Sequence, residues 1–151
     1  MTLQIIRTLH PPAPFLTQLA GMLTRAGYVT TPEDVQRRIN TLPEEDRILL
    51  AIEGHTLMGY AHMHLSRTLT HADTVDIVAV LVHPEYRRRG IGRRLVTAAE
   101  AFARDKQRSR LRLCANVLES DLHAFFVSLG YQETSTLIEF IDTLQADLPA
   151  A

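Results

Sequence analysis

Short apolar segments, rich in isoleucine, leucine and valine, recur along the chain and predict β-strands. One of them is almost continuously apolar from Ile77 to Val82, which is typical of a central strand covered on both faces. Another alternates its side chains around Tyr60, so that alternate residues project from one face. The predicted strands are residues 3–7, 47–53, 56–66, 74–83, 110–115 and 136–142.

Apolar residues at helical spacing predict four helices between these strands. In the first helix, Leu19 and Leu23 belong to the apolar stripe, and Gly27 follows as a typical helix end. Thr31 is a typical N-cap and Pro32 suits the first position of the second helix. The predicted helices are residues 14–27, 31–42, 90–106 and 120–130.

The order of these elements indicates the fold class. A strand and two helices precede three consecutive strands, after which helices and strands alternate. This order predicts an α/β (α+β) fold, in which a mixed central sheet has helices on both faces. The length of 151 residues fits a single domain, residues 1–151, with a substantial core.

Composition and charge argue against several functions. The net charge is −1, with 16 Lys and Arg against 17 Asp and Glu, so we expect no general binding to nucleic acid or to a membrane surface. The single cysteine, Cys114, cannot form an internal disulfide, which favours a reducing compartment. Neither a signal peptide nor an apolar run of about 18 residues is found, and we expect a soluble cytoplasmic protein.

Positive charge is nevertheless concentrated at one point, where five arginines lie between Arg87 and Arg94 and flank Gly90 and Gly92. This stretch follows the central strand and begins a helix. Glycines let the backbone approach a ligand, amides at a helix N-terminus bind anions, and arginines attract phosphate oxygens. The spacing is neither GxGxxG nor GxxxxGK[ST]. The stretch therefore predicts a phosphate-binding loop of another kind.

This loop resembles the acyl-CoA loop of the GNAT superfamily of N-acetyltransferases, which has the form [Q/R]-x-x-G-x-[G/A] after a strand ending like VHPEY. Here LVHPEYRRRGIGRRL contains Arg87-x-x-Gly90-x-Gly92. A second stretch, SDLHAFFVSLGYQE, resembles the family's second signature, a helix that ends in Leu-Gly-Tyr. The order of elements is similar to the family's from Leu3 to Leu144.

The resemblance implies an enzyme, an acetyl-CoA-dependent N-acetyltransferase, in which a primary amine attacks the thioester directly in a ternary complex. It implies a mostly antiparallel sheet whose fourth and fifth strands splay apart after Arg110, with the pantetheine arm in the gap. Cys114 would then be a small buried strand residue and not a nucleophile. The residues that would contact acetyl-CoA are Val80, Leu81 and Val82 along the arm, Arg87, Arg88, Arg89, Gly90, Ile91, Gly92 and Arg93 at the pyrophosphate, and Asn116, His123 and Phe126 beyond them.

Two positions depart from the family's pattern. The family commonly has a glycine directly after the first loop residue, and Arg88 stands there, which is tolerable if the backbone needs no positive φ. Many members have a tyrosine on the penultimate helix that protonates the CoA thiolate, and Phe126 occupies that position. A general acid contributes about 10²–10⁴-fold to the rate, so its loss matters. Tyr131 is a candidate for the acid.

The amine acceptor must lose a proton, and two groups of residues are candidates for the base. Asp76 has the same two-residue parity as Val78, Val80 and Val82 and is expected on their face, although a solvated carboxylate at a strand start is the simpler explanation. Tyr60, His62 and His64 share one face of their strand, where they line an acceptor cleft or form a half-exposed polar surface. With no further clustered ligand, we expect no metal.

The acceptor itself is a small-molecule or peptide amine, bound in part by Tyr28 of the loop between the first two helices. A homodimer through the C-terminal strands suits the family. The alternative is a non-catalytic acyl-CoA-binding or regulatory domain of the same fold, which the phenylalanine at position 126 makes plausible.

Overall fold

The computed structural model describes residues 2–115 and 118–144. The chain divides into two compact units, Met1–Cys114 and Ala115–Ala151. The first unit holds the sheet and three of the helices, and the second holds the helix that precedes Leu-Gly-Tyr. The expectation of a single domain stays a prediction.

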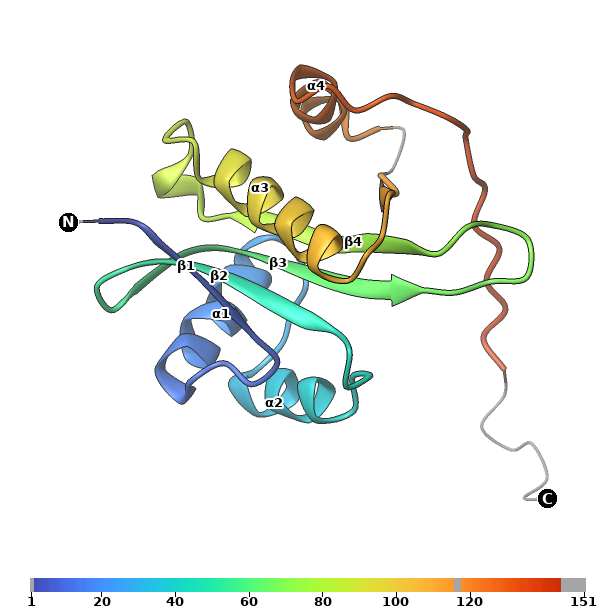
Figure 1. Ribbon diagram of the computed structural model, residues 1–151. Helices are drawn as coiled ribbons and strands as arrows, with labels where there is room; N and C mark the ends of the chain where they lie inside the picture. The colour runs from blue at the N-terminus through green and yellow to red at the C-terminus, as the bar shows by residue number, and fades with distance from the viewer. Residues whose placement is uncertain (1, 116–117, 145–151) are drawn as a thin grey trace. The chain divides into compact units, whose positions relative to one another are not determined.

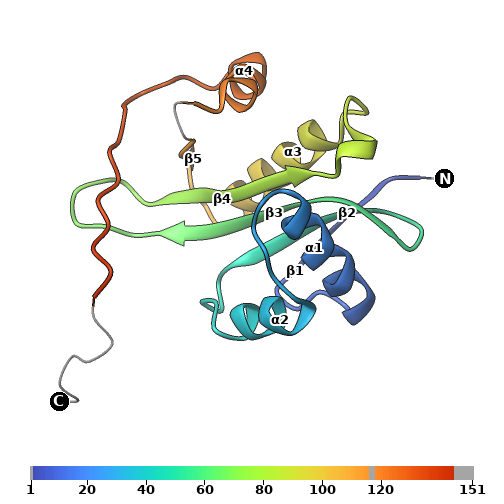
Figure 2. The ribbon, with the colours of Figure 1, turned by 180° about the vertical axis from the view of Figure 1, so that it is seen from behind.

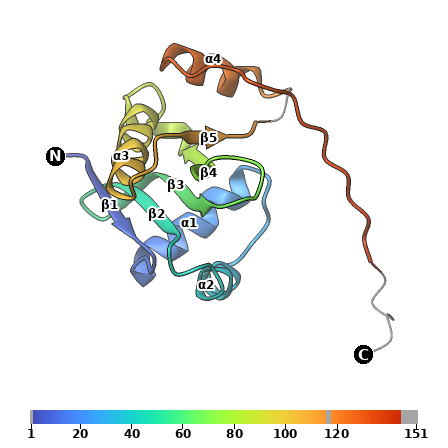
Figure 3. The same cartoon turned by 45° about the vertical axis from the view of Figure 1, so that its right-hand side comes forward.

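Five strands form one mixed sheet in the order β1-β2-β3-β4-β5 (Figures 1 and 3). The first three neighbouring pairs are antiparallel, and β4 and β5 are parallel. The predicted fold class, a mixed and mostly antiparallel sheet, is therefore confirmed. The strands are β1 (Gln4–Thr8), β2 (Arg47–Glu53), β3 (Thr56–Ser66), β4 (Thr74–Val82) and β5 (Leu111–Leu113).

Helices cover both faces of this sheet, as Figures 1 and 2 show: α1 (Ala13–Arg25) and α2 (Pro32–Asn40) lie on one face, and α3 (Ile91–Asp105) lies on the other. The apolar run of β2 contributes buried side chains to both faces of the sheet. Ile48, Leu50 and Ile52 are buried in the cluster formed with α1 and α2, and the alternation of a strand turns Leu49 and Ala51 to the opposite face. A strand in this position must be apolar on both sides.

The local signals work as expected at the ends of α1 and α2. Gly27 follows α1 with a φ of 102°. The Oγ1 of Thr31 accepts a hydrogen bond from the Asp34 amide at 3.1 Å, and Pro32 occupies the first turn of α2. These caps set the length of the α1–α2 loop, which carries the exposed side chain of Tyr28.

A close approach between α3 and the sheet occurs at Gly59 on β3. A Cβ at this position would lie 2.9 Å from the carbonyl oxygen of Leu81 and 3.3 Å from side-chain atoms of both Ile91 and Leu95. Only a residue without a side chain lets the first turn of α3 reach this depth. Gly59 therefore fixes the height of the α3 N-terminus above β4.

In the second unit, α4 (Ser120–Ser128) begins after its N-cap Glu119 and ends before Gly130, whose φ is 91°. The predicted last strand, Thr136–Asp142, is wrong for the structure described, because residues 131–144 form neither helix nor strand. A strand requires a hydrogen-bonded neighbour, and this segment pairs with none of the described residues.

Candidate active site

The arginine–glycine loop connects β4 to α3 by a sharp path. A short 3-10 turn, Pro84–Tyr86, follows the strand, and the His83 Nδ1 accepts a hydrogen bond from the Glu85 amide at 3.1 Å. Gly90 is the N-cap of α3 with φ 76°, and no described side chain caps the helix there. The first amides of α3 are therefore left to solvent or to a ligand, at the positive end of the helix dipole. This is a favourable site for an anion.

Arg88 adopts φ 64°, so the backbone does need a positive φ at the position where the family commonly has glycine. The condition under which arginine was expected to be tolerated is therefore not met. A non-glycine residue in this region costs about 1–2 kcal/mol. The loop thus keeps a strained conformation, a feature that concentrates at binding sites.

Not all of the five arginines extend freely from the loop. Arg94 Nη1 donates to the Leu3 carbonyl at 3.0 Å, and the Arg89 guanidinium lies over the Tyr86 ring, 5.5 Å from its centroid. Arg87 Nε donates to the Val82 carbonyl at 3.5 Å, and all five arginines are exposed. The positive charge is therefore partly used to brace the loop and partly presented to solvent.

Next to the loop, β4 loses its partner on one side. β5 pairs with β4 only from Val75 to Ile77, whereas Ala79–Val82 pair with β3 alone in the described part of the chain. The sequence analysis predicted that the two strands separate directly after Arg110. In the structure they separate after Leu113. The backbone groups of successive strand residues point to opposite edges, so Val80 and Val82 face this open side, where they can bind an extended ligand, whereas Leu81 faces β3.

A β-bulge lies at the point where the pairing ends. His62 is opposite Ala79 and Met63 is opposite Ile77, so Val78 is an extra residue in β4 and its side chain is 56% exposed. The bulge reverses the alternation. Asp76 shares a face with Ala79 and Leu81, and the prediction that it shares a face with Val80 and Val82 is wrong.

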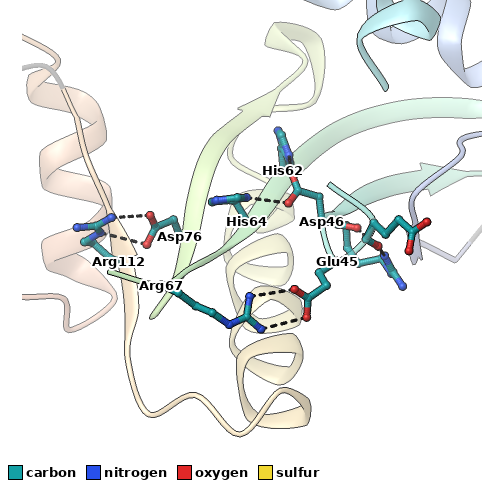
Figure 4. A network of polar contacts seen from close by, with 9 residues as sticks. Glu45, Asp46, His62, His64, Arg67, Asp76 and Arg112 are labelled. Atoms are coloured by element: carbon teal, nitrogen blue, oxygen red, sulfur yellow. Dashed lines mark hydrogen bonds and ion pairs between the residues drawn. The ribbon is translucent and has the colours of Figure 1, made fainter. Parts of the chain in front are cut away.

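Asp76 is engaged in an ion pair across the parallel strands (Figure 4). Arg112 donates from Nε at 3.1 Å and from Nη2 at 2.6 Å, and Thr74 Oγ1 donates at 2.8 Å. Burial alone would raise the pKa of the Asp76 carboxyl, but the hydrogen bonds from Arg112 and Thr74 lower it below its ordinary value. A carboxylate held in this way is a weak base, and it ties β5 to β4.

The face of β3 that the alternation predicted exists, and a residue that the sequence analysis missed organises it. The carboxylate of Asp46, which directly precedes β2 and is 2% exposed, accepts hydrogen bonds from His62 Nε2 and His64 Nδ1, both at 2.8 Å (Figure 4). The hairpin register offered a signal, because Arg47 opposite Met63 places Asp46 opposite His64. The acidic run Glu44–Asp46 alone gave no reason to choose among its members.

Tyr60 lies on the same face and partly packs against the α1 and α2 core. Burial raises the pKa of its phenol to about 12, and the neighbouring Tyr28 adds to the effect. Tyr60 is therefore neutral at physiological pH and can donate a hydrogen bond but cannot act as a base. The predicted acceptor residues Tyr28, Tyr60, His62 and His64 thus belong to one region of the first unit.

The remaining predicted residues lie elsewhere. In the second unit, Phe126 is buried and its ring contacts that of Tyr131 edge-on, at 5.2 Å between centroids. His123 is on α4, and Asn116 lies outside the described residues. Cys114 is exposed and follows the end of β5, so the prediction of a buried strand cysteine is wrong.

Two absences concern the described residues only. Within residues 2–115 and 118–144, no group of three or more His, Cys, Asp and Glu side chains is arranged to hold a metal ion. No helix in the same part of the chain is long and apolar enough to cross a membrane.

Comparison with known proteins connects this geometry to a family. Residues 13–131, well over half of the chain, match the family described as "Acetyltransferase (GNAT) family". A CoA complex of the aminoglycoside N-acetyltransferase AAC(6')-Iy has the same fold, with a TM-score of 0.80 at 13% identity over 95% of this chain and 96% of that one.

Two curated proteins are similar over shorter stretches. Aminoalkylphosphonate N-acetyltransferase of Salmonella typhimurium is 28% identical over 96 residues, 63% of this chain and 62% of that protein. N-alpha-acetyltransferase 80 of Mus musculus is 39% identical over 71 residues, 47% of this chain and 21% of that protein. The matches thus span less than two thirds of the length of either relative.

Proposed function

Because the chain belongs to the acetyltransferase (GNAT) family, whose members use acetyl-CoA, we propose that it is an enzyme that transfers an acetyl group from acetyl-CoA to a primary amine. The amine attacks the thioester directly while both substrates are bound. The observation that carries the proposal is the junction of β4 and α3, where an uncapped helix N-terminus lies next to a strand with one open side.

The junction suits two parts of an acyl-CoA, the pyrophosphate and the pantetheine arm. The pyrophosphate carries negative charge, which the amides from Gly90 to Arg93 and the guanidinium groups of Arg87, Arg88 and Arg89 would bind. The pantetheine arm carries amides, which would pair with the backbone of Val80 and Val82 as an added strand does. These contacts involve backbone atoms, so they do not depend on which side chains the strand carries.

We place the acceptor at the Tyr28, Tyr60, His62 and His64 face. This face combines polar imidazole groups with tyrosine rings, which fits a small molecule that carries a primary amine. The names of the Salmonella relative and of the aminoglycoside enzyme also specify small amines. An amine nitrogen attacking a thioester needs a proton acceptor, and the two histidines are the groups of this face whose ring nitrogens can accept a proton.

Protonation of the departing CoA thiolate is assigned to Tyr131, because Phe126 cannot donate a proton. The assignment of Asn116, His123 and Phe126 to cofactor binding stays a prediction from the sequence. Asp76 is not assigned the role of base here, because its ion pair with Arg112 occupies both oxygens. We assign it to holding the parallel strands together at the point where they separate.

We further propose a cytoplasmic homodimer in which residues 136–142 pair with a second copy. The segment is extended and its large apolar side chains, including Leu137, Ile138 and Phe140, are exposed. Apolar strands of this kind are stable when they are paired. Sedimentation velocity tests the dimer: the parent chain should sediment as a dimer and Phe140→Asp as a monomer, and a monomeric parent would refute it.

The activity is tested by thiol release. The protein is incubated with acetyl-CoA and a panel of primary amines, including aminoglycosides, polyamines, aminoalkylphosphonates and a peptide N-terminus, and free CoA thiol is measured with a chromogenic disulfide. Amine-dependent thiol release supports the proposal. Tight binding of acetyl-CoA with no release across the panel would favour a non-catalytic acyl-CoA-binding domain instead.

A further inference from the structure

We propose that His64 is the general base of the acetyl transfer and that Asp46 and His62 are positioning residues that orient it. This inference rests on the proposed function, since it names the group that takes the proton from the acceptor amine. The inference is supported by the hydrogen-bonded cluster of Asp46, His62 and His64, which lies at the start of β2 and the end of β3. It is also supported by the position of this cluster beside the β4 bulge.

The buried carboxylate defines how the His64 ring is held. Asp46 Oδ1 accepts from His64 Nδ1 and Oδ2 accepts from His62 Nε2, so each oxygen has its own imidazole. The backbone around Asp46 is also braced, because its amide donates to the Pro43 carbonyl at 3.0 Å and its carbonyl accepts from Arg47 Nη1 at 2.6 Å. With Nδ1–H directed at Asp46, the lone pair of His64 resides on Nε2, where it can accept a proton.

Exposure distinguishes the two histidines. The His64 side chain is 40% exposed and that of His62 only 18%, although both contact the same carboxylate. A base must reach the ammonium group of an incoming substrate. His64 can do so. His62 is more buried, and its Nε2 is hydrogen-bonded to the second carboxylate oxygen of Asp46.

The position of His64 relative to the sheet fits this role. It lies opposite Asp76 on β4, and the unpaired residue Val78 separates Asp76 from the stretch of β4 that lacks a β5 partner. The proposed pantetheine arm runs along that stretch. His64 is therefore on the acceptor face next to the point where the sheet opens.

The charged groups that face the His64 ring come from each neighbouring element. Asp46 contributes from the loop before β2, and Asp76 contributes from β4, with Arg112 of β5 balancing part of its charge. Glu45 lies nearby but is paired with Arg67, at 2.9 and 3.1 Å. The imidazolium would thus face two carboxylates and one paired cation.

The ammonium nitrogen gives one proton to His64 Nε2, and its lone pair then forms a C–N bond with the thioester carbonyl carbon. The C–S bond breaks and its electron pair goes to sulfur. The Tyr131 hydroxyl protonates the thiolate, the second proton leaves the new amide nitrogen and restores that hydroxyl, and His64 returns its proton to solvent.

The test is the pH dependence of kcat/KM for the parent and for His64→Asn, with an amine that the parent acetylates. Asparagine keeps a donor near the Nδ1 position but cannot accept the proton. We expect a loss of about 10²–10⁴-fold near neutral pH, which disappears as the pH rises above the pKa of the free amine. Asp46→Asn should show a smaller loss with the same pH dependence.

Control variants near the cluster show whether the effect is specific to His64. His55→Asn, in the exposed turn of the same hairpin, and Glu45→Gln, one residue from Asp46, should leave the profile unchanged. His64→Gln replaces the asparagine variant if thermal unfolding shows that the latter does not fold. Parent-like activity of the His64 variant, or a loss equal at every pH, would overturn the inference alone. Failure of the parent to acetylate any amine would overturn the proposed function as well.

Discussion

Replacing Gly59 by alanine tests how the sheet supports the cofactor loop. The new Cβ would lie 2.9 Å from the Leu81 carbonyl oxygen, which is a backbone atom of the paired strand and cannot rotate away. It would also press on Ile91 and Leu95 at 3.3 Å, in the first turns of α3. Both contacts are too close, so α3 or β4 must move.

The expected cost follows from these contacts. Overpacking in a close-packed interior costs about 1–3 kcal/mol, and alanine recovers about 0.5–1 kcal/mol relative to glycine within a strand. We therefore expect Gly59→Ala to lower the free energy of unfolding by about 1–2 kcal/mol, which is a fall of several degrees in Tm for a chain of this size. Displacement of the α3 N-terminus should also weaken acetyl-CoA binding.

Gly21→Ala is the matched control, because its Cβ meets no atom within 4 Å and Gly21 lies within α1. This variant should gain about 0.5–1 kcal/mol, since alanine is the better helix former. Urea denaturation gives both free energies, and calorimetric titration gives the affinity for acetyl-CoA. A Gly59→Ala protein as stable as the parent would refute the packing argument.

Two further predictions concern the ion pair and the strained loop. The folded state lowers the pKa of Asp76, so its carboxylate stabilises the fold above its ordinary value of 3.8 and this contribution is lost as the pH falls through the folded pKa. Asp76→Asn should accordingly be less stable than the parent in urea at pH 7, and the difference should shrink as the pH falls below 3.8; a difference that does not change with pH would contradict this assignment. Arg88→Gly should raise the stability by up to about 1 kcal/mol, because relief of the positive φ outweighs the added freedom of glycine in the unfolded chain. A less stable glycine variant in the same denaturation assay would show that Arg88 is not strained.

The sequence was most informative where one local signal determines the structure. Strands β2 and β3 have the predicted bounds, Thr31 caps the start of α2, and Gly27 follows the end of α1, as expected. The turn from β4 into α3 was also predictable, because its proline, glycines and helix start are contiguous. Signals of this kind depend on neighbours within a few residues.

Features that depend on pairing between distant residues were not predictable. The face of Asp76 was assigned by counting in twos, and one bulge residue, Val78, reversed the result. Asp46 became visible only through the register of β2 with β3. The apolar segment 136–142 has the composition of a strand, yet composition does not supply a hydrogen-bonding partner.

The central claim is that acetyl-CoA binds at the junction of β4 and α3. Calorimetric titration with acetyl-CoA, on the parent, Gly90→Glu and Gly54→Glu, tests it most directly. Gly54 has a similar positive φ, 63° against 76°, so both variants carry the same charge and comparable strain. We expect tight binding by the parent and by Gly54→Glu, and a loss of about tenfold or more, about 1.4 kcal/mol, in Gly90→Glu. Equal affinity of all three proteins, or no binding by the parent, would contradict the claim.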